Sequence, residues 1–257
     1  MTASLAGSPP TAPPPSTVAE VIARMEAIAR PLSDSDGVAC FTRLYLEVTE
    51  GVHAELGALT FADPPFVADL DIRFANLFFD AVDELAKPGG GNVPRAWAPL
   101  FEARSRRGVA PLQFAIAGMN AHINRDLPLA VVASCRHAAV EPEEGSPQHA
   151  DYLRINQLLA TVEGRIKEQY LSGWLHRLDR VLHRIHRLDD IVAMWNITRA
   201  RDAAWTNAEV LWTLRDSPAL TTRYLATLDR SVGLAGRALL TPADTWVGRF
   251  GRFLHLG

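Results

Sequence analysis

The chain has 257 residues, 48% of them hydrophobic and 21% charged, and its net charge is −3. That length allows one large domain with a sizeable core, and the weakly acidic charge argues against nucleic acid as a partner. No apolar run reaches the roughly 18–20 residues that span a bilayer, so we expect no transmembrane segment. The two cysteines, Cys40 and Cys135, lie in apolar surroundings, which is typical of free thiols in a reducing cytosol.

The first sixteen residues are rich in proline, alanine, serine and threonine, and none of them is charged. They lack the basic start and apolar core of a signal peptide, so we expect a disordered tail over 1–16 and a cytoplasmic protein. From residue 17 to residue 257 we expect a single all-helical domain. Thr17 and Glu20 have the spacing of a capping box, which predicts a helix through about Arg30.

Apolar residues at helical spacing predict further helices along the rest of the chain. Pro128 should kink or divide the helix that contains it, and loops are indicated at 87–94 and 141–147. Strong alternation with period two is missing, so the fold class is all-α, a single bundle-like domain of about eight to ten helices. The expected helices after the first are 38–59, 66–85, 95–106, 111–132, 149–182, 188–215, 220–240 and 242–254.

The stretch 118–128 is the most informative part of the sequence, because it places four polar side chains inside an apolar run. His122 and Asp126 are four residues apart, and so are Asn120 and Asn124. On a helix such pairs share a face. Burying them costs roughly 1–3 kcal/mol for each group that finds no partner. We therefore predict a catalytic site here. His122 and Asp126 would be its reacting side chains, and Asn120 and Asn124 would orient ligands or substrate.

A second histidine–aspartate pair with the same spacing, His186 and Asp190, lies in a densely charged run. Imidazole and carboxylate groups four residues apart can ligate one metal, so two such helices would supply four ligands. Arg–Asp pairs on a solvated helix face are the alternative interpretation of this run. Glu50, inside an apolar stripe, and Asp71, at the start of another, are further candidate ligands.

Aromatic and arginine residues alternate near the C-terminal side and could line a pocket for an apolar or anionic ligand. Core packing with peripheral salt bridges explains the same pattern equally well. The sequence holds no nucleotide-binding glycine loop, no serine-nucleophile motif and no C-x-x-C. The candidate substrate-binding residues are Trp195, Arg199, Arg201 and Trp205.

Several blocks resemble a family of uncharacterised actinobacterial proteins that is known only as a domain of unknown function. The resemblance implies a shared helical fold and brings no activity with it. The blocks are 41–50, 70–80, 117–128 and 200–205.

The sequence is also similar to the helical zinc-dependent phospholipase C and nuclease group, whose helices carry H-x-x-x-D ligand pairs. His122 to Asp126, the following Pro128-Leu129 step, and His186 to Asp190 match this pattern. The ligating histidine expected after the Pro-Leu step is Ala130 here, and the N-terminal tryptophan ligand is missing. The likeness therefore implies one or two metals rather than three.

Our leading hypothesis from the sequence is a metal-dependent helical hydrolase for a small or lipid-like substrate. A divalent metal (zinc, iron or manganese) would activate a water and polarise the substrate. It would bind in an interhelical pocket. The predicted ligands are His122, Asp126, Asp71 and Glu50, with His186 and Asp190 as further members.

Two other hypotheses stay open. In one, His122 and Asp126 form a metal-free acid–base dyad that isomerises, cyclises or hydrolyses a small apolar metabolite. In the other, the protein is a non-enzymatic ligand-binding or protein-binding module, and the polar stretch fixes the register of its helices. The sequence does not determine the oligomeric state.

Overall fold

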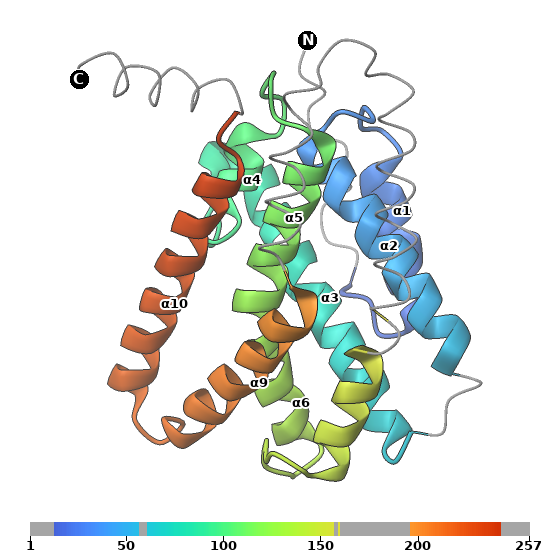
Figure 1. Cartoon of the computed structure of the whole chain (residues 1–257), viewed down its shortest axis with the longest axis vertical. Coiled ribbons are helices and arrows are strands. Elements are labelled where there is room, and N and C mark those ends of the chain that lie inside the picture. The colour runs from blue at the N-terminus through green and yellow to red at the C-terminus, as the bar shows by residue number, and fades with distance from the viewer. Residues whose placement is uncertain (1–12, 57–60, 157–158, 160–195, 243–257) are drawn as a thin grey trace, which may run out of the picture.

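A computed structural model describes residues 13–56, 61–156, 159 and 196–242 of the chain (Figure 1). The regular structure in these residues is entirely helical, as the sequence predicted. None of the described helices is long and apolar enough to cross a membrane.

Three long helices form the N-terminal part of the fold. In α1 (Val18–Ala29), the side chains of Thr17 and Glu20 make the predicted capping box. The second helix, α2 (Gly37–Leu56), begins after Asp36, whose carboxylate accepts from the backbone N–H groups of Val38 and Ala39. The third, α3 (Pro64–Ala86), is capped by Asp63 and has a proline in its first turn, where no N–H is needed.

The predicted helix 95–106 is much shorter in the structure. The loop before it contains a 3₁₀ turn, η1 (Pro88–Gly90), and α4 is limited to Ala98–Ala103. Pro99 lies in the first turn of α4, where a proline favours a helix start. Residues 95–97 form a turn instead, and the N–H groups of Arg95 and Ala96 donate to the carboxylate of Asp229.

The segment that contains the polar stretch is helical without interruption from residue 111 to residue 137. It consists of α5 (Pro111–Ala121), one turn of π-helix, η2 (His122–Asp126), and α6 (Leu127–His137). The N–H of Leu127 donates to the carbonyl of His122, five residues back. Pro128 has no N–H and would collide with the carbonyl four residues before it in a regular helix. We attribute the wide turn to this proline, which was predicted to kink or divide the helix.

The C-terminal described part consists of residues 147–156, α9 (Ile197–Thr213) and α10 (Pro218–Leu239). The first and last of these ranges agree with the helices predicted there. The helix predicted from 188 to 215 was wrong at Asn196, which has an extended backbone and caps the start of α9 with its side chain. The predicted helix 242–254 and most of the predicted helix 149–182 lie outside the described residues, as does the start of the one predicted from residue 188.

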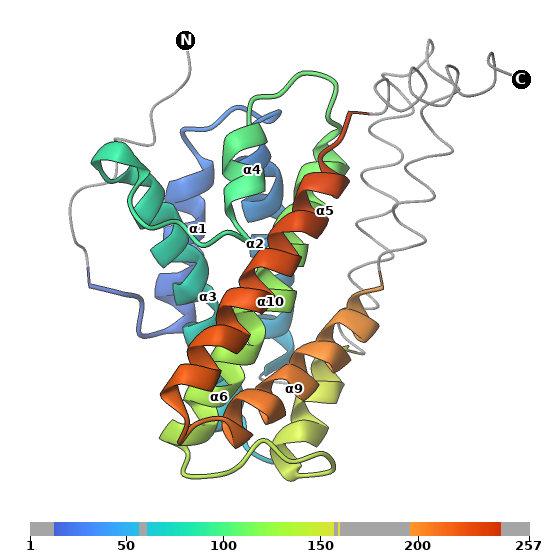
Figure 2. The ribbon, with the colours of Figure 1, turned by 90° about the vertical axis from the view of Figure 1, so that its left-hand side faces the viewer.

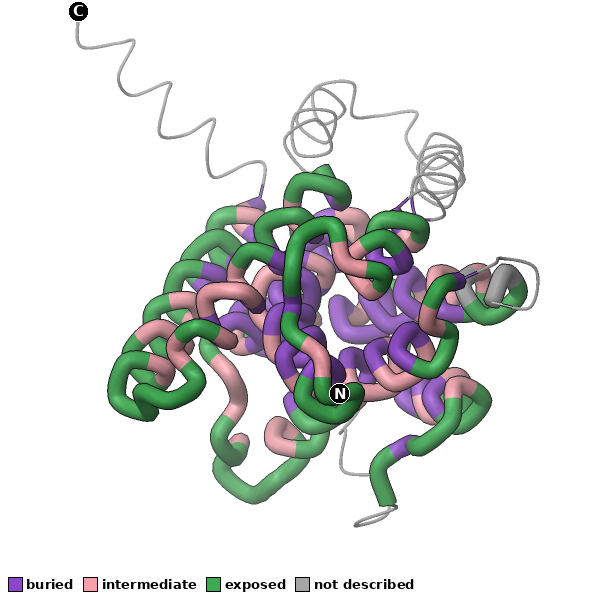
Figure 3. The backbone as a smooth tube through the Cα atoms, turned by 90° about the horizontal axis from the view of Figure 1, so that it is seen from below, coloured by how far each residue is buried: buried purple, intermediate pink, exposed green. Residues whose placement is uncertain are grey.

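Helices α5 and α6 follow one another along the middle of the molecule, with α1 and α2 on one side and α10 on the other (Figures 1 and 2). The buried residues gather at the centre of the bundle and the exposed ones on its outside (Figure 3). The core extends from α1 to α10 as one continuous apolar cluster.

A glycine allows α2 to approach α5 closely. A Cβ atom at Gly118 would lie 2.4 Å from two ring atoms of Phe41. Phe41 is buried, and its ring contacts those of Tyr45, Trp97 and His122. Because the glycine at position 118 has no side chain, the aromatic residues of α2 can pack against the π-turn.

A buried imidazole–carboxylate pair at the π-turn

The polar stretch forms one contact group inside the core. The imidazole Nδ1 of His122 lies 3.2 Å from Oδ2 of Asp126. The side chains of both residues are buried, with 3% and 0% of their surface exposed. Since the carboxylate accepts at this contact, the neutral imidazole carries its proton on Nδ1 and has a free electron pair on Nε2.

Asp126 is held by two further donors. The indole Nε1 of Trp97 donates to Oδ2 over 2.9 Å, and Nη1 of Arg125 donates to Oδ1 over 2.6 Å. The guanidinium of Arg125 also lies 3.7 Å from the carboxylate of Asp229 on α10. Donors therefore engage both oxygens of Asp126, which fixes the carboxylate and through it the orientation of the imidazole.

Aromatic rings enclose the imidazole. Phe74 of α3 stacks flat on His122, with ring centroids 3.5 Å apart and planes within 5°. Tyr45 of α2 lies at 4.5 Å with its ring tilted by 65°, and Phe41 and Trp97 lie at 5.7 and 5.9 Å. Burial lowers the pKa of His122, and the contact with Asp126 only partly opposes this. The imidazole is therefore neutral near pH 7.

Several buried polar atoms of the core have no hydrogen-bond partner among the described residues. They include Nε2 of His122, the hydroxyl of Tyr45 and Oδ2 of Asp71, all of them buried atoms. Burial, followed by the charges of Asp71 and Asp126, raises the pKa of Tyr45 well above its ordinary range. The neighbouring hydroxyl of Thr49 opposes this shift, although the geometry of the two hydroxyls is not that of a hydrogen bond. Native proteins leave few buried polar atoms unpaired, so these atoms are candidates for contact with a ligand or a bound water.

Asp71 connects this group to a buried arginine. Burial raises the pKa of its carboxyl to about 7, although the positive charge of Arg201 counteracts the shift. Arg201 of α9 is 5% exposed, and its Nε donates to the side-chain oxygen of Asn156. Its guanidinium lies over the ring of Tyr152, 4.2 Å from the centroid. We call His122, Tyr45, Asp71 and Arg201 the row of polar groups, because the ring of Tyr45 contacts His122, the charge of Asp71 acts on Tyr45 and the charge of Arg201 acts on Asp71.

The two asparagines of the polar stretch bond to the protein itself. The side-chain N–H of Asn124 donates to Asn120 over 3.1 Å, and that of Asn120 donates to the backbone carbonyl of Val232 over 3.0 Å. These two hydrogen bonds connect the π-turn to α10. The expected role of the two asparagines in orienting a substrate has no support in these contacts.

The predicted metal ligands do not form a donor set in the part of the chain that the structure describes. No group of three or more histidine, cysteine, aspartate or glutamate side chains there could hold a metal ion. Asp126 and His122 bond to each other, and the positive charge of Arg125 lies against the same carboxylate. Glu50, predicted to point inward, is exposed. It lies about 140° around α2 from Tyr45, which faces the core. His186 and Asp190 lie outside the described residues, so their part in a site stays a prediction.

The four predicted substrate-binding residues have different environments. Arg201 is buried and belongs to the row of polar groups, whereas Arg199 is exposed. Trp205 is buried, and its indole N–H donates to Glu209 over 3.1 Å. Trp195 lies outside the described residues. Of the three that the structure describes, only Arg201 interacts with a residue of the candidate site, through its charge on Asp71.

Sequence reasoning missed Trp97, Phe74, Tyr45 and Arg125 as parts of the site. Three of them come from other segments and reach His122 or Asp126 only through packing. Arg125 is adjacent to Asp126 in sequence, and its charge beside a buried carboxylate was the one local signal available.

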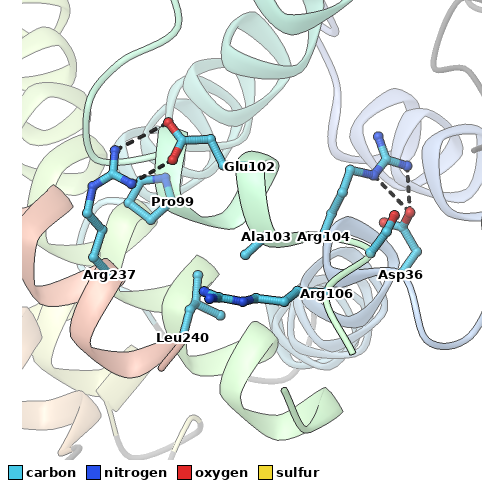
Figure 4. Close-up of a pocket in the computed structure, with 9 residues that line it drawn as sticks. Asp36, Pro99, Glu102, Ala103, Arg104, Arg106, Arg237 and Leu240 are labelled. Carbon is cyan, nitrogen blue, oxygen red and sulfur yellow. Dashed lines mark hydrogen bonds and ion pairs between the residues drawn. The ribbon is translucent and has the colours of Figure 1, made fainter. Parts of the chain in front are cut away.

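A separate hollow of about 750 Å³ lies between α4 and α10. Figure 4 shows that its charged groups pair across the rim, Arg237 with Glu102 and Arg104 with Asp36. Arg106 extends between these pairs and is exposed. The hollow offers no unpaired base, so it is a weaker candidate for chemistry than the buried pair.

The fold and the site define an all-helical protein with a buried imidazole–carboxylate pair at a π-turn of its central helix. The chain belongs to a family of unknown function, DUF5995, whose family model matches residues 18–242. This match includes all the described helices. The comparison with curated proteins found no match, and neither did the comparison with solved structures.

Proposed function

We propose that the protein is a metal-independent acid–base enzyme that moves a proton on a small, largely apolar carbonyl compound. The observation that carries the proposal is the unpaired Nε2 of His122, whose opposite nitrogen is fixed by Asp126. A neutral imidazole oriented in this way is a general base near pH 7.

The residues around His122 supply the rest of the chemistry. Nε2 takes a proton from the carbon next to the carbonyl, and Asp126 stabilises the imidazolium that results. The hydroxyl of Tyr45 donates a hydrogen bond to the carbonyl oxygen as negative charge develops there. A phenol with a raised pKa in an apolar site remains protonated and can donate in this way. Where a carbon–carbon double bond of the substrate is conjugated with the enolate, return of the proton from Nε2 to the far carbon of that bond completes an isomerisation.

The donor set of the described residues favours this function over metal-dependent hydrolysis. A metal bound jointly by His122 and Asp126 would have to displace the contact between them and accept Arg125 as a neighbour. A buried dication beside a guanidinium is electrostatically unfavourable. The effect of EDTA on the assay below separates metal-dependent hydrolysis from the proposed function.

Deuterium uptake from D₂O is a direct assay for proton abstraction from carbon. We expect the untagged protein to exchange protons of enolisable ketones, with 4-oxocyclohexanecarboxylate and cyclohexanone in the panel, in the presence of EDTA. His122→Gln should abolish the exchange and Tyr45→Phe should slow it. The matched control is His137→Gln, because His137 is an exposed histidine that contacts Asp69 over 2.9 Å. Uptake that EDTA abolishes would favour the metal hypothesis, and no uptake across the panel would contradict the proposal.

A further inference from the structure

We infer that the site takes a substrate with a carboxylate group, and that Arg201 and Asn156 bind this group. The inference rests on the proposed function, because it assigns the substrate class of the same site.

The guanidinium of Arg201 is buried and forms no ion pair with a carboxylate of the described residues, although the charges of Asp202 and Asp71 partly oppose the effect of burial on its pKa. Its Nε donates to the side-chain oxygen of Asn156, and Nη2 donates to the backbone carbonyl of Tyr152 over 3.3 Å. Both acceptors are neutral. A buried guanidinium that lacks an anionic partner is costly. The remaining N–H groups of Arg201 can meet a ligand anion with the two-pronged geometry that a carboxylate fits.

Asn156 supplies a second donor at the same place. Its side-chain oxygen faces Arg201, which assigns the other end of the amide as NH₂. This Nδ2 atom is buried and has no partner among the residues that the structure describes. The guanidinium of Arg201 and the NH₂ group of Asn156 can only donate hydrogen bonds. They therefore favour a ligand group that accepts them, and an anionic one in particular.

The opposite end of the row offers a different set of groups. Nε2 of His122 is an acceptor and the Tyr45 hydroxyl a donor, neither has a hydrogen-bond partner among the described residues, and the two rings lie 4.5 Å apart. The ring of Phe74 is the apolar surface next to them. A molecule with a carboxylate at one end and a carbonyl further along an apolar skeleton would satisfy both ends. The geometry thus points to an oxo acid.

Arg201 also has a purely structural interpretation. It connects residues 147–156 to α9 through Asn156 and Tyr152, and the hydroxyl of Tyr152 donates to the carbonyl of Arg201 over 2.7 Å. A structural arginine would lower stability when replaced but would not discriminate a charged ligand from a neutral one. The charge preference of binding therefore separates the two interpretations.

The test compares cyclohexanecarboxylate with cyclohexanecarboxamide, which differ mainly in charge, by ligand-observed NMR on the full chain. We expect the carboxylate to bind at least about tenfold more tightly than the amide. Arg201→Gln should remove this difference and Arg201→Lys should keep part of it. Arg199→Gln is the matched control, an exposed arginine two residues away on α9, and should leave binding unchanged.

Equal binding of the two probes, or no binding of either, would overturn the inference. This comparison uses the wild-type protein, so it decides the question even if Arg201→Gln does not fold. It is also independent of catalysis. A carboxylate preference without deuterium exchange would contradict the proposed function alone, whereas exchange of cyclohexanone as fast as of 4-oxocyclohexanecarboxylate would contradict the carboxylate site alone.

Discussion

Trp97 donates its indole N–H to Oδ2 of Asp126 over 2.9 Å, and so α4 is connected to the π-turn inside the core. The same oxygen contacts the imidazole of His122. The orientation of His122 thus depends on Trp97, which lies 29 positions before Asp126 in the sequence. This relationship leads to the first prediction.

Replacing Trp97 with phenylalanine removes the donor and keeps an aromatic ring in the core. We expect the free energy of unfolding to fall by about 1–3 kcal/mol, because a buried carboxylate loses one of its partners. Urea denaturation measures the change. The matched control is Trp205→Phe, whose indole bonds to the partly exposed Glu209 on the same helix. Equal losses in both variants would show that ring volume, and not the bond to Asp126, is responsible.

Gly118→Ala should destabilise the protein by about 1–3 kcal/mol, as overpacking of a core does. The added methyl group would lie 2.4 Å from the buried ring of Phe41, and the rings packed around Phe41 oppose its movement. Gly236→Ala is the control, because its nearest neighbour, Pro99, lies at an ordinary 3.4 Å. There the better helix propensity of alanine should stabilise by up to about 1 kcal/mol. A stabilising Gly118→Ala would refute the close approach of α2 and α5.

Asp71 predicts a specific dependence of stability on pH. Its pKa is raised from an ordinary 3.8 to about 7, so the folded protein holds this proton more tightly than the unfolded chain. The contribution of the protonated Asp71 carboxyl to the free energy of unfolding is fully present below pH 3.8, and it is lost as the pH rises through about 7. Asp71→Asn cannot lose a proton, so its stability relative to wild type should increase between pH 5 and pH 8. Denaturation of both proteins at the two pH values measures this. A constant difference would contradict the raised pKa.

The local part of the site followed from the sequence, and the long-range part did not. The spacing of His122 and Asp126 predicted their contact, because residues four apart on a helix are neighbours whatever the rest of the fold does. Trp97 reaches Asp126 only because α4 packs beside the central helix, and no local pattern records that packing. Glu50 was predicted to face inward from the apolar residues around it, but the buried face of α2 contains Phe41 and Tyr45 and leaves Glu50 exposed.

The fold class and most helix ranges were also predicted, since hydrophobic period and capping are local signals. The sequence predicted a kink or a division of the helix at Pro128, but not a π-turn. The proline removes a hydrogen bond, but whether the helix kinks, breaks or widens depends on the side chains that surround it. Here Asp126, inside the wide turn, bonds to Trp97 and Arg125.

The central claim is that His122 is a neutral, unmetallated imidazole with its proton on Nδ1 and a free Nε2. The most direct measurement is long-range ¹H–¹⁵N NMR of protein labelled at histidine, purified without a tag, with the His122→Gln variant to assign the signal. We predict one protonated nitrogen, Nδ1, and one unprotonated nitrogen, Nε2, at pH 7, unchanged by a chelator. An imidazolium, a proton on Nε2, or a metal-bound signal that a chelator abolishes would contradict the account.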